Sequence, residues 1–518
     1  MKVGIHWFRR DLRIQDNRAL AEISNQVDRL VLLFVLDSRL TSPQAKPLPR
    51  SAFLLDCLTS LKEDLEEKGQ TLCVRAGRPE WVIPGLIEEL GASVLSFSEG
   101  VTPFARSRDT RVRSLVEEAG VAVIDSIDES VIPPMQLKTL DDSTFKVFAP
   151  FRKAWWREWN RAPVKPIPDF TIPPSVPGQG SSDVEIPGLA EVWRGMESVP
   201  RGGAKAAHER LNEFLAGPVG RYESDRDRPD RDGTSRMSAY LRFGSISSRV
   251  CVDKALEARA RAPEIAEGVD KWIGELIWRD FYVHITWAEP GILNRNVRSE
   301  FDRMEWNDDP EAFAAWANGV TGYPLVDAGM RQLRKTGWMH NRVRMVVASF
   351  LTKDLLIDWR KGERLFMDLL IDGDPASNNG GWQWTASTGN EAQPFFRIYN
   401  PVSQGKTHDP DCTYIKRWVP ELRDVPARDI HSLWKHNARP EAYPAPMVDH
   451  TVQRDLAIEA YERMRKADQF DLRSARRRAE EDVIRAALEE TGGNRTAAAR
   501  LLGISHRSIM YKLKEMDE

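Results

Sequence analysis

Residues 371 to 390, with the sequence IDGDPASNNGGWQWTASTGN, combine residue types that an ordinary hydrophobic core does not need. The segment holds two aspartates, three asparagines, four glycines and two tryptophans. Glycines let a backbone approach a flat ligand closely, the carboxylates of Asp372 and Asp374 accept hydrogen bonds, and Trp382 and Trp384 offer aromatic surfaces. The segment is therefore predicted to form a wall of a cofactor or base pocket.

A second group of residues that could do chemistry lies in KWIGELIWRDF, residues 271 to 281. On a helix, Glu275 lies three residues from Trp278 and four from Arg279, so these side chains share one face. A single carboxylate beside an indole is usually an ordinary buried pair. Here it occurs together with Asn341 and Arg342 in the segment WMHNRVRM, and that coincidence favours a binding site.

Length and composition limit the kind of protein that holds these residues. A chain of 518 residues is expected to form two to four domains, and 41% hydrophobic with 29% charged residues is typical of a globular protein. Most of the 17 tryptophans are expected to be buried, and a subset could carry electrons or stack on bases. The net charge of −3 gives no overall signal for nucleic acid, so DNA binding would need a local basic surface.

The cysteines and the N-terminus indicate the compartment. The four cysteines are scattered and form no CxxC pair or metal-ligand cluster, which favours a reduced, cytoplasmic chain and predicts no metal site. The segment MKVGIHWFRRDLR lacks the apolar core of a signal peptide, and no stretch is long enough to span a membrane.

The pattern along the chain predicts the elements that position these residues. Expected strands are 2–7, 30–36, 71–75, 93–98 and 122–125, alternating with helices at 50–69, 79–91 and 106–120. This alternation predicts an α/β domain with a parallel sheet, whose ligands lie at the carboxyl ends of the strands. Residues 160–200 are rich in Pro, Gly and Ser and are expected to be an exposed connection. From about 200 to 470 the periodicity is mainly helical.

The last forty residues divide into three short predicted helices. Gly492 and Gly493 end the first, Asn494 or Thr496 caps the second, and Ser505 caps the third after a turn at Gly503. This spacing is typical of a helix-turn-helix, and the alternative is a small helical dimerisation cap. The segment resembles the DNA-binding module of the Fis family.

Four other segments carry a second resemblance. They are HWFRRDLRIQDNRAL, TGYPLVDAGMRQL, TGWMHNRVRMVVASFLTKDLLIDWR and DGDPASNNGGWQWTASTG, and together they resemble the photolyase and cryptochrome flavoproteins over roughly residues 1 to 470. The most similar type is the class I cyclobutane pyrimidine dimer photolyase. This resemblance implies an α/β antenna-chromophore domain at 1–132, an interdomain linker at 133–200, an all-helical FAD-binding catalytic domain at 201–470 and the helix-turn-helix module at 471–518.

The resemblance implies FAD as the cofactor and assigns residues to its pocket. The cradle for the FAD phosphates would be Tyr222, Thr234, Ser235, Arg236, Met237 and Ser238, whose hydroxyls, amides and guanidinium suit phosphate. Trp272, Asp372, Gly373 and Asp374 would line the rest of the pocket. Asn378 would face flavin N5, where a neutral amide tolerates a reduced, anionic flavin and so favours repair. Trp382, Trp359 and Trp306 match the family's chain of tryptophans that passes electrons to the flavin.

The same resemblance predicts the lesion and the DNA contacts. Photolyases for the 6-4 photoproduct carry histidines where this chain has Asn341 and Met345, which favours the cyclobutane dimer as the substrate. Glu275, Asn341 and Met345 would hold a flipped dimer, and Trp278 and Trp384 would stack on its bases. The residues expected to contact the DNA backbone are Arg226, Arg342, Arg397 and Gln404, and those expected in a groove are His506 and Arg507.

Two functions from different classes follow from these assignments. The first is an enzyme, a photolyase in which light-excited reduced FAD donates an electron to the dimer, the ring bonds break and the electron returns. The second is a cryptochrome-like blue-light receptor that regulates transcription through the helix-turn-helix. The motif around Phe104 and Ala105 leaves the antenna chromophore open among deazaflavin, flavin, folate or none. Dimerisation through the C-terminal module, and association with the nucleoid, are further expectations.

Overall fold

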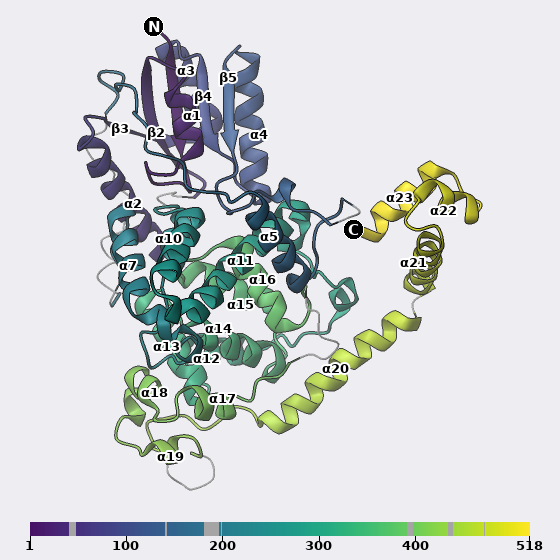
Figure 1. Cartoon of the computed structure of the whole chain (residues 1–518). Helices are drawn as coiled ribbons and strands as arrows, with labels where there is room; N and C mark the ends of the chain where they lie inside the picture. Colours follow the sequence, from purple (N-terminus) through teal and green to yellow (C-terminus); the bar gives the residue numbers. More distant parts are fainter. Residues whose placement is uncertain are drawn as a thin grey trace.

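The computed structural model describes residues 1–40, 48–139, 142–180, 196–197, 199–390, 397–433, 439–470 and 472–517. Its N-terminal part is a five-stranded parallel sheet covered by helices, as the alternating pattern predicts (Figure 1). The strands are β1 (Val3–Phe8), β2 (Arg29–Asp37), β3 (Leu72–Gly77), β4 (Val94–Ser98) and β5 (Ala122–Ser126), in the order β3-β2-β1-β4-β5. The helices are α1 (Arg18–Ser24), α2 (Pro49–Glu66), α3 (Pro79–Leu90) and α4 (Pro103–Glu118).

The predicted linker contains a helix that composition alone did not indicate. Helix α5 (Phe148–Arg161) lies inside the predicted range 133–200, and Phe151, Trp155 and Trp159 are buried on one of its faces. These residues recur every three to four positions, which is a helical pattern. Residues 163 to 180, by contrast, form no helix, and Ser175 among them pairs with Leu30 of β2. Residues 181 to 195 of the predicted linker lie outside the described residues.

The second domain is built of helices, in agreement with the predicted periodicity (Figure 1). Its helices are α7 (Ala204–Ala216), α8 (Tyr222–Asp225), α9 (Ser238–Phe243), α10 (Ser248–Arg261), α11 (Ala266–Ala288), α12 (Pro310–Asn318), α13 (Pro324–Thr336), α14 (Asn341–Ser349), α15 (Trp359–Leu369), α16 (Pro375–Ala386), α17 (Pro401–His408), α18 (Thr413–Trp418) and α19 (Ala427–Ile430). A π-helical turn, η6 (Phe350–Asp354), extends α14. Helix α11 packs against α5, α8, α10 and α16 and is therefore central to the domain.

The first two domains share a continuous hydrophobic core. One cluster includes Phe8 and Leu20 of the sheet domain together with Trp272 and Phe281 of α11. Charged residues also join the two domains. Arg249 of α10 is fully buried and contacts Asp128 and Asp16 of the sheet domain, each at 3.0 Å. Because a buried charge is costly without its partner, these ion pairs fix how the two domains meet.

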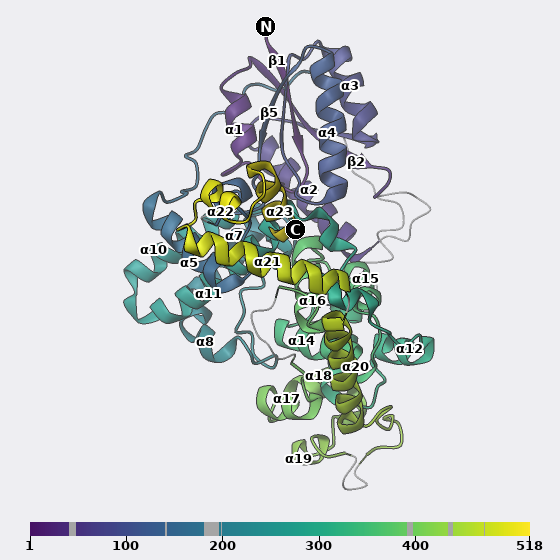
Figure 2. The same cartoon turned by 90° about the vertical axis from the view of Figure 1, so that its right-hand side faces the viewer.

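The C-terminal module has a small core of its own. After α20 (His450–Phe470) come α21 (Leu472–Glu490), α22 (Arg495–Leu501) and α23 (His506–Asp517), whose core contains Ile484, Ala498 and Ile509. Asn494 caps α22 by accepting from the amides of Thr496 and Ala497, and Ser505 Oγ accepts from the amide of Ser508. Figures 1 and 2 place α21 to α23 outside the main body, connected to it through α20.

Two smaller findings complete the description of the fold. All four cysteines are buried as free thiols. Within the part of the chain that the structure describes, no helix combines the length and apolar character needed to cross a bilayer.

Candidate active site and cofactor pocket

The predicted lesion-binding residues lie on helices that pack together. Helix α11 contacts both α8 and α16, and α16 contacts α14. Glu275 of α11 accepts a hydrogen bond from Arg226, at the end of α8, with 2.7 Å between Oε1 and Nη1. Glu275 remains 33% exposed, so its carboxylate is accessible to a ligand while the arginine orients it. Arg226 was predicted to contact DNA phosphate, and in the structure its first partner is this carboxylate.

A second arginine of the predicted DNA surface is also paired. Arg342 of α14 donates two hydrogen bonds to Asp227, at 3.2 and 2.7 Å. Burial would raise the pKa of Asp227, but the hydrogen bond and charge of Arg342 lower it below its ordinary value. On the same helix, Asn341 Nδ2 lies 3.8 Å from Met345 Sδ on the exposed surface. The predicted pair of Asn341 and Met345 is therefore adjacent and accessible.

The aromatic residues expected to stack on bases differ in their surroundings. Trp278 is stacked on Phe148, with ring centroids 3.5 Å apart and planes inclined by 7°, so one of its faces is covered. Tyr282 lies one turn further along the same face of α11, 5.7 Å from Trp278. Trp384 of α16 is partly exposed and carries Arg397 over its ring at 5.4 Å. Sequence reasoning missed Phe148 because it falls in the predicted linker.

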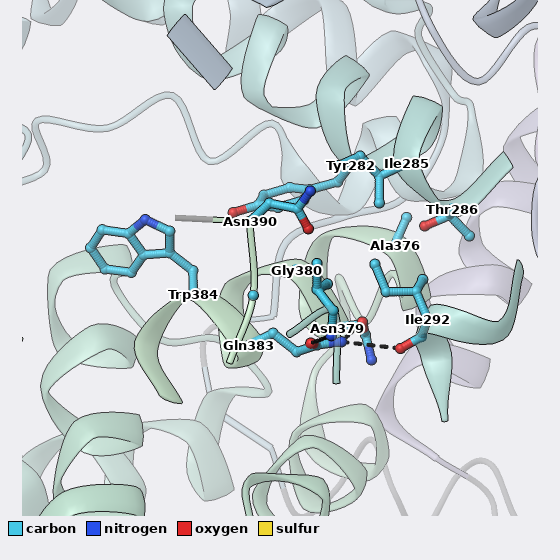
Figure 3. A pocket seen from close by; sticks show the side chains of 12 residues that line it. Tyr282, Ile285, Thr286, Ile292, Ala376, Asn379, Gly380, Gln383, Trp384 and Asn390 are labelled. Atoms are coloured by element: carbon cyan, nitrogen blue, oxygen red, sulfur yellow. Dashed lines mark hydrogen bonds between the residues drawn. The ribbon is translucent and has the colours of Figure 1, made fainter. Parts of the chain in front are cut away.

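A small cavity lies between α11 and α16, beside Trp384 (Figure 3). Its volume is about 10 Å³, and Tyr282, Gly380, Gln383 and Asn390 belong to its lining. A Cβ atom at Gly380 would lie 2.1 Å from the Tyr282 ring, so glycine is needed for the two helices to approach this closely. The volume suits one water molecule and not a base. A base that stacks on Trp384, as predicted, would therefore lie outside this cavity.

The loop predicted to hold phosphates lies between α8 and α9, and its backbone is strongly constrained. Arg210 donates to the carbonyls of Thr234 and Ser235, and Trp272 Nε1 donates to Ser235 Oγ at 3.1 Å. Arg236 adopts φ +54°, a left-handed conformation that is uncommon for a residue with a side chain. Arg236 lies two residues before the start of α9. Met237 and Ser238 follow directly, at the N-terminus of that helix.

The aromatic residues behind this loop form one packed group. Tyr222 meets Phe214 at 5.7 Å, and Phe214 meets Trp272 at 5.1 Å. Burial and the nearby charge of Glu275 raise the pKa of the Tyr222 phenol, which therefore stays protonated at neutral pH. The predicted residues Tyr222, Ser235 and Trp272 are thus brought together.

The predicted residues Asp372, Gly373 and Asp374 are held by three arginines. Arg344 pairs with Asp372 at 2.8 Å, and Arg242 donates to the Gly373 carbonyl at 2.7 Å. Asp374 caps α16 by accepting from the Ser377 amide, and its other oxygen pairs with Arg10. Burial would raise the pKa of Asp374, but the charges of Arg10 and Arg242 lower it. This carboxylate is therefore ionised.

Asn378 and its neighbour are oriented by Glu363 of α15. Asn378 Nδ2 donates to the Glu363 carbonyl at 3.1 Å, and Asn379 Nδ2 donates to its carboxylate at 3.0 Å. This bond uses one of the two hydrogens on Asn378 Nδ2, so the second hydrogen and the amide oxygen are left to meet a ligand. Burial raises the pKa of Glu363 to about 7, although Asn379 donates to it.

The three tryptophans of the predicted relay pack against the same hydrophobic cluster. Trp382 is buried against Phe366 at 4.9 Å, and a Cβ at Gly362 would lie 2.2 Å from its ring. Trp359 is fully buried and donates from Nε1 to Asn296 at 2.9 Å. Trp306 lies at the margin of the cluster, 6.5 Å from Tyr461 of α20. The order from buried to partly exposed agrees with a relay, whose operation stays a prediction.

The remaining predicted DNA contacts lie on the surface or beside it. Arg397 is exposed, and Gln404 of α17 has a buried Oε1 without a hydrogen-bond partner among the described residues. His506 and Arg507 are exposed at the start of α23. Near the carboxyl edge of the sheet, Phe104 packs under Arg39 at 4.9 Å. This contact does not distinguish among the four antenna alternatives.

Comparison with known proteins identifies the family. Residues 4–170 match the family model of DNA photolyase, and residues 272–463 match the FAD binding domain of DNA photolyase. Residues 475–516 match the bacterial regulatory protein, Fis family. The fold and the site thus define a flavoprotein with an added helix-turn-helix. The chain belongs to the photolyase and cryptochrome family.

Individual relatives extend over nearly all of the first two domains. Deoxyribodipyrimidine photo-lyase of Halobacterium salinarum is 39% identical over 489 residues, covering 89% of this chain and 99% of the relative. The enzyme of the same name from Escherichia coli is 38% identical, covering 90% of this chain and 100% of the relative. A class III photolyase from Agrobacterium tumefaciens superposes with a TM-score of 0.78 at 33% identity, covering 90% of this chain and 98% of that structure. A Synechocystis cryptochrome gives 0.80 at 28% identity, with coverages of 89% and 99%.

The residues present fit FAD. Burial lowers the pKa of His340 to about 4, so the ring is neutral, and its Nδ1 accepts from the Arg342 amide. The ring proton is thereby assigned to Nε2, a buried donor without a partner among the described residues. Asp372 Oδ1 is likewise buried, and this acceptor has no hydrogen-bond partner among the described residues. One buried donor and one buried acceptor without partners, both in the helical domain, suit a polar cofactor.

Proposed function

We propose that this protein repairs cyclobutane pyrimidine dimers in DNA in a light-dependent reaction. The observation that carries the proposal is the accessible group of Glu275, Asn341, Met345 and Trp384 on the packed helices α11, α14 and α16. Relatives at 38 to 39% identity that bear the name deoxyribodipyrimidine photo-lyase support it. A light sensor without a substrate would not need such a group.

Each side chain has a role in this proposal. The bound reduced flavin supplies, on excitation by light, the electron that opens the dimer. Glu275 accepts hydrogen bonds from the pyrimidine edge, and Arg226 holds its carboxylate in place. Asn341 and Met345 contact the dimer from α14, and Trp384 stacks on an extruded base. Asn378 presents its amide to the flavin, and its hydrogen bond to the Glu363 carbonyl orients that amide.

The proposal is tested by illuminating the full, FAD-loaded and reduced chain with a DNA oligonucleotide that carries one thymine dimer. We expect the dimer to disappear under blue light and to persist in the dark. Bound FAD without repair would instead favour the second candidate, a light-responsive regulator that acts through α21 to α23. The match of residues 475–516 to the Fis family is the observation that supports this candidate.

Removing residues 472–518 tests the role of the C-terminal module. If the module tethers the enzyme to DNA, the truncated chain should bind long undamaged duplexes more weakly and repair a short lesion oligonucleotide as before.

The exposure of Val483 (57%) and Leu501 (60%) supports the further proposal of dimerisation through this module. Its mass in solution should then fall to that of a monomer on truncation. Nucleoid association predicts that the truncated chain leaves the DNA-bound fraction of cells. If the truncated chain binds long undamaged duplexes as tightly as the full chain does, the module does not tether the enzyme to DNA.

We also propose that Trp382, Trp359 and Trp306 carry electrons to the oxidised flavin. The direct test is photoreduction in Trp359→Phe, which should be slower than in the unaltered chain. Equal rates in the two proteins would argue against this route.

A further inference from the structure

The linker between the first two domains contacts the predicted lesion-binding surface at Phe148. Its ring covers a face of Trp278 with a centroid distance of 3.5 Å and an angle of 7°. Phe281 meets both rings edge-on, at 5.8 Å from Phe148 and 5.7 Å from Trp278. Trp278 is therefore covered on one face by Phe148 and contacted edge-on by Phe281, and Tyr282, one helical turn away, lies 5.7 Å from it.

Phe148 is itself held firmly, because it is the first residue of α5. One turn later, Phe151 packs against Phe281 at 5.3 Å and against His284 at 4.9 Å. In the next turn, Trp155 Nε1 donates to Asp280 at 2.9 Å. These contacts all go to α11, the helix that carries Trp278. The stack is thus part of a fixed helix pair and not a contact of a loose loop.

The linker also contacts the segment that follows α16, the helix that carries Trp384. Asn390, which follows α16 and Trp384, donates from Nδ2 to the carbonyl of Lys146 at 2.8 Å. Residues 146 to 148 therefore join the segment beside Trp384 to the ring of Trp278. A short piece of linker connects the two indoles that are proposed to contact the dimer.

We propose that Phe148 is a positioning residue, which holds the Trp278 indole in the orientation that stacks on an extruded pyrimidine dimer. The inference rests on the proposed function. An indole covered on one face and contacted edge-on has one orientation to offer to a base, so it loses little freedom on binding. Without the phenyl ring, Trp278 can adopt other rotamers, and binding must select one of them.

The test compares Phe148→Ala, Phe148→Tyr and the control Phe145→Ala in the full, FAD-loaded chain. Phe145 belongs to the same linker, but its ring packs on Phe151 at 5.9 Å. We expect Phe148→Ala to weaken binding of a thymine-dimer oligonucleotide by about 2- to 12-fold, the range of an aromatic pair. Repair per bound lesion in a single flash, and affinity for undamaged duplex, should stay as in the unaltered chain. Phe148→Tyr keeps an aromatic ring at this position and should bind the dimer as tightly as the unaltered chain does. Phe145→Ala should also bind the dimer as tightly as the unaltered chain does.

Two results would overturn the inference. One is unchanged dimer affinity in Phe148→Ala while the unaltered chain binds and repairs the dimer. The other is an equal loss of affinity in Phe145→Ala, which would indicate general damage to the linker. If Phe148→Ala does not fold, Phe148→Leu replaces it, because leucine keeps an apolar side chain without stacking. Failure of repair in the unaltered chain would instead reject the proposed function.

Discussion

Glu275→Ala is expected to weaken binding of dimer-containing DNA by about 10- to 100-fold, the value of a hydrogen bond to a charged group. Glu275 supplies an acceptor at the accessible end of the group, and Arg226 fixes it at 2.7 Å. The same change frees Arg226, whose charge can then meet a phosphate. Affinity for undamaged DNA should therefore stay constant or rise, and the preference for damaged DNA should fall. Competition binding with matched damaged and undamaged oligonucleotides measures both.

The chain offers a matched control for this variant. Glu223 pairs with Lys271 at 3.0 Å, and this exposed ion pair joins the same two helices, α8 and α11. Glu223→Ala should leave dimer binding unchanged, because exposed pairs contribute little. Glu275→Gln separates charge from hydrogen bonding, since the amide keeps an acceptor. If Glu275→Ala binds dimer-containing DNA as tightly as the unaltered chain does, Glu275 does not contribute to dimer binding.

Asp280→Ala is expected to lower the free energy of unfolding by about 3 kcal/mol, since several buried donors lose their acceptor at once. Asp280 is fully buried in α11 and accepts from Trp155 Nε1 at 2.9 Å and from the Val131 amide at 3.1 Å. The Ile132 amide donates to it at 3.4 Å. Denaturant unfolding of the FAD-free chain measures the effect.

Asp280→Asn is the control for size, because asparagine keeps one acceptor oxygen and should cost less than alanine. We also expect Asp280→Ala to loosen α5, since Trp155 then loses its partner on α11. Equal stability of the alanine and asparagine variants would show that the hydrogen bonds to Asp280 are not what holds this helix.

The fold was largely predictable, because its signals are local. Each predicted strand lies within a residue or two of its observed bounds, since the runs that form buried parallel strands are short, apolar and separated by helices that end near Gly69, Gly91 and Gly120. Asn494 and Ser505 likewise act as predicted, because capping depends on neighbours two or three residues away. Helix α5 was missed because the proline-rich stretch after it determined the interpretation of the whole segment.

The partners within the site were much less predictable. Glu275 and Arg342 were singled out by their motifs and by the family resemblance, but a single sequence does not indicate which charged side chains form pairs. Arg226 and Glu275 are 49 positions apart, and Arg342 and Asp227 are 115 apart. These pairs depend on how α8, α11 and α14 cross, which periodicity does not specify. The contact of Phe148 was not predicted for the same reason, since its partner Trp278 lies on a helix far along the chain.

The buried contacts of Arg249 with Asp16 and Asp128 limit how this chain could be rearranged by recombination. Exchanging the sheet domain alone would leave the guanidinium without counter-charges inside a core that both domains share. The C-terminal module has its own core around Ile484 and Ile509. It is a piece that gene fusion could add or remove without unfolding the rest, whereas the first two domains must be inherited together.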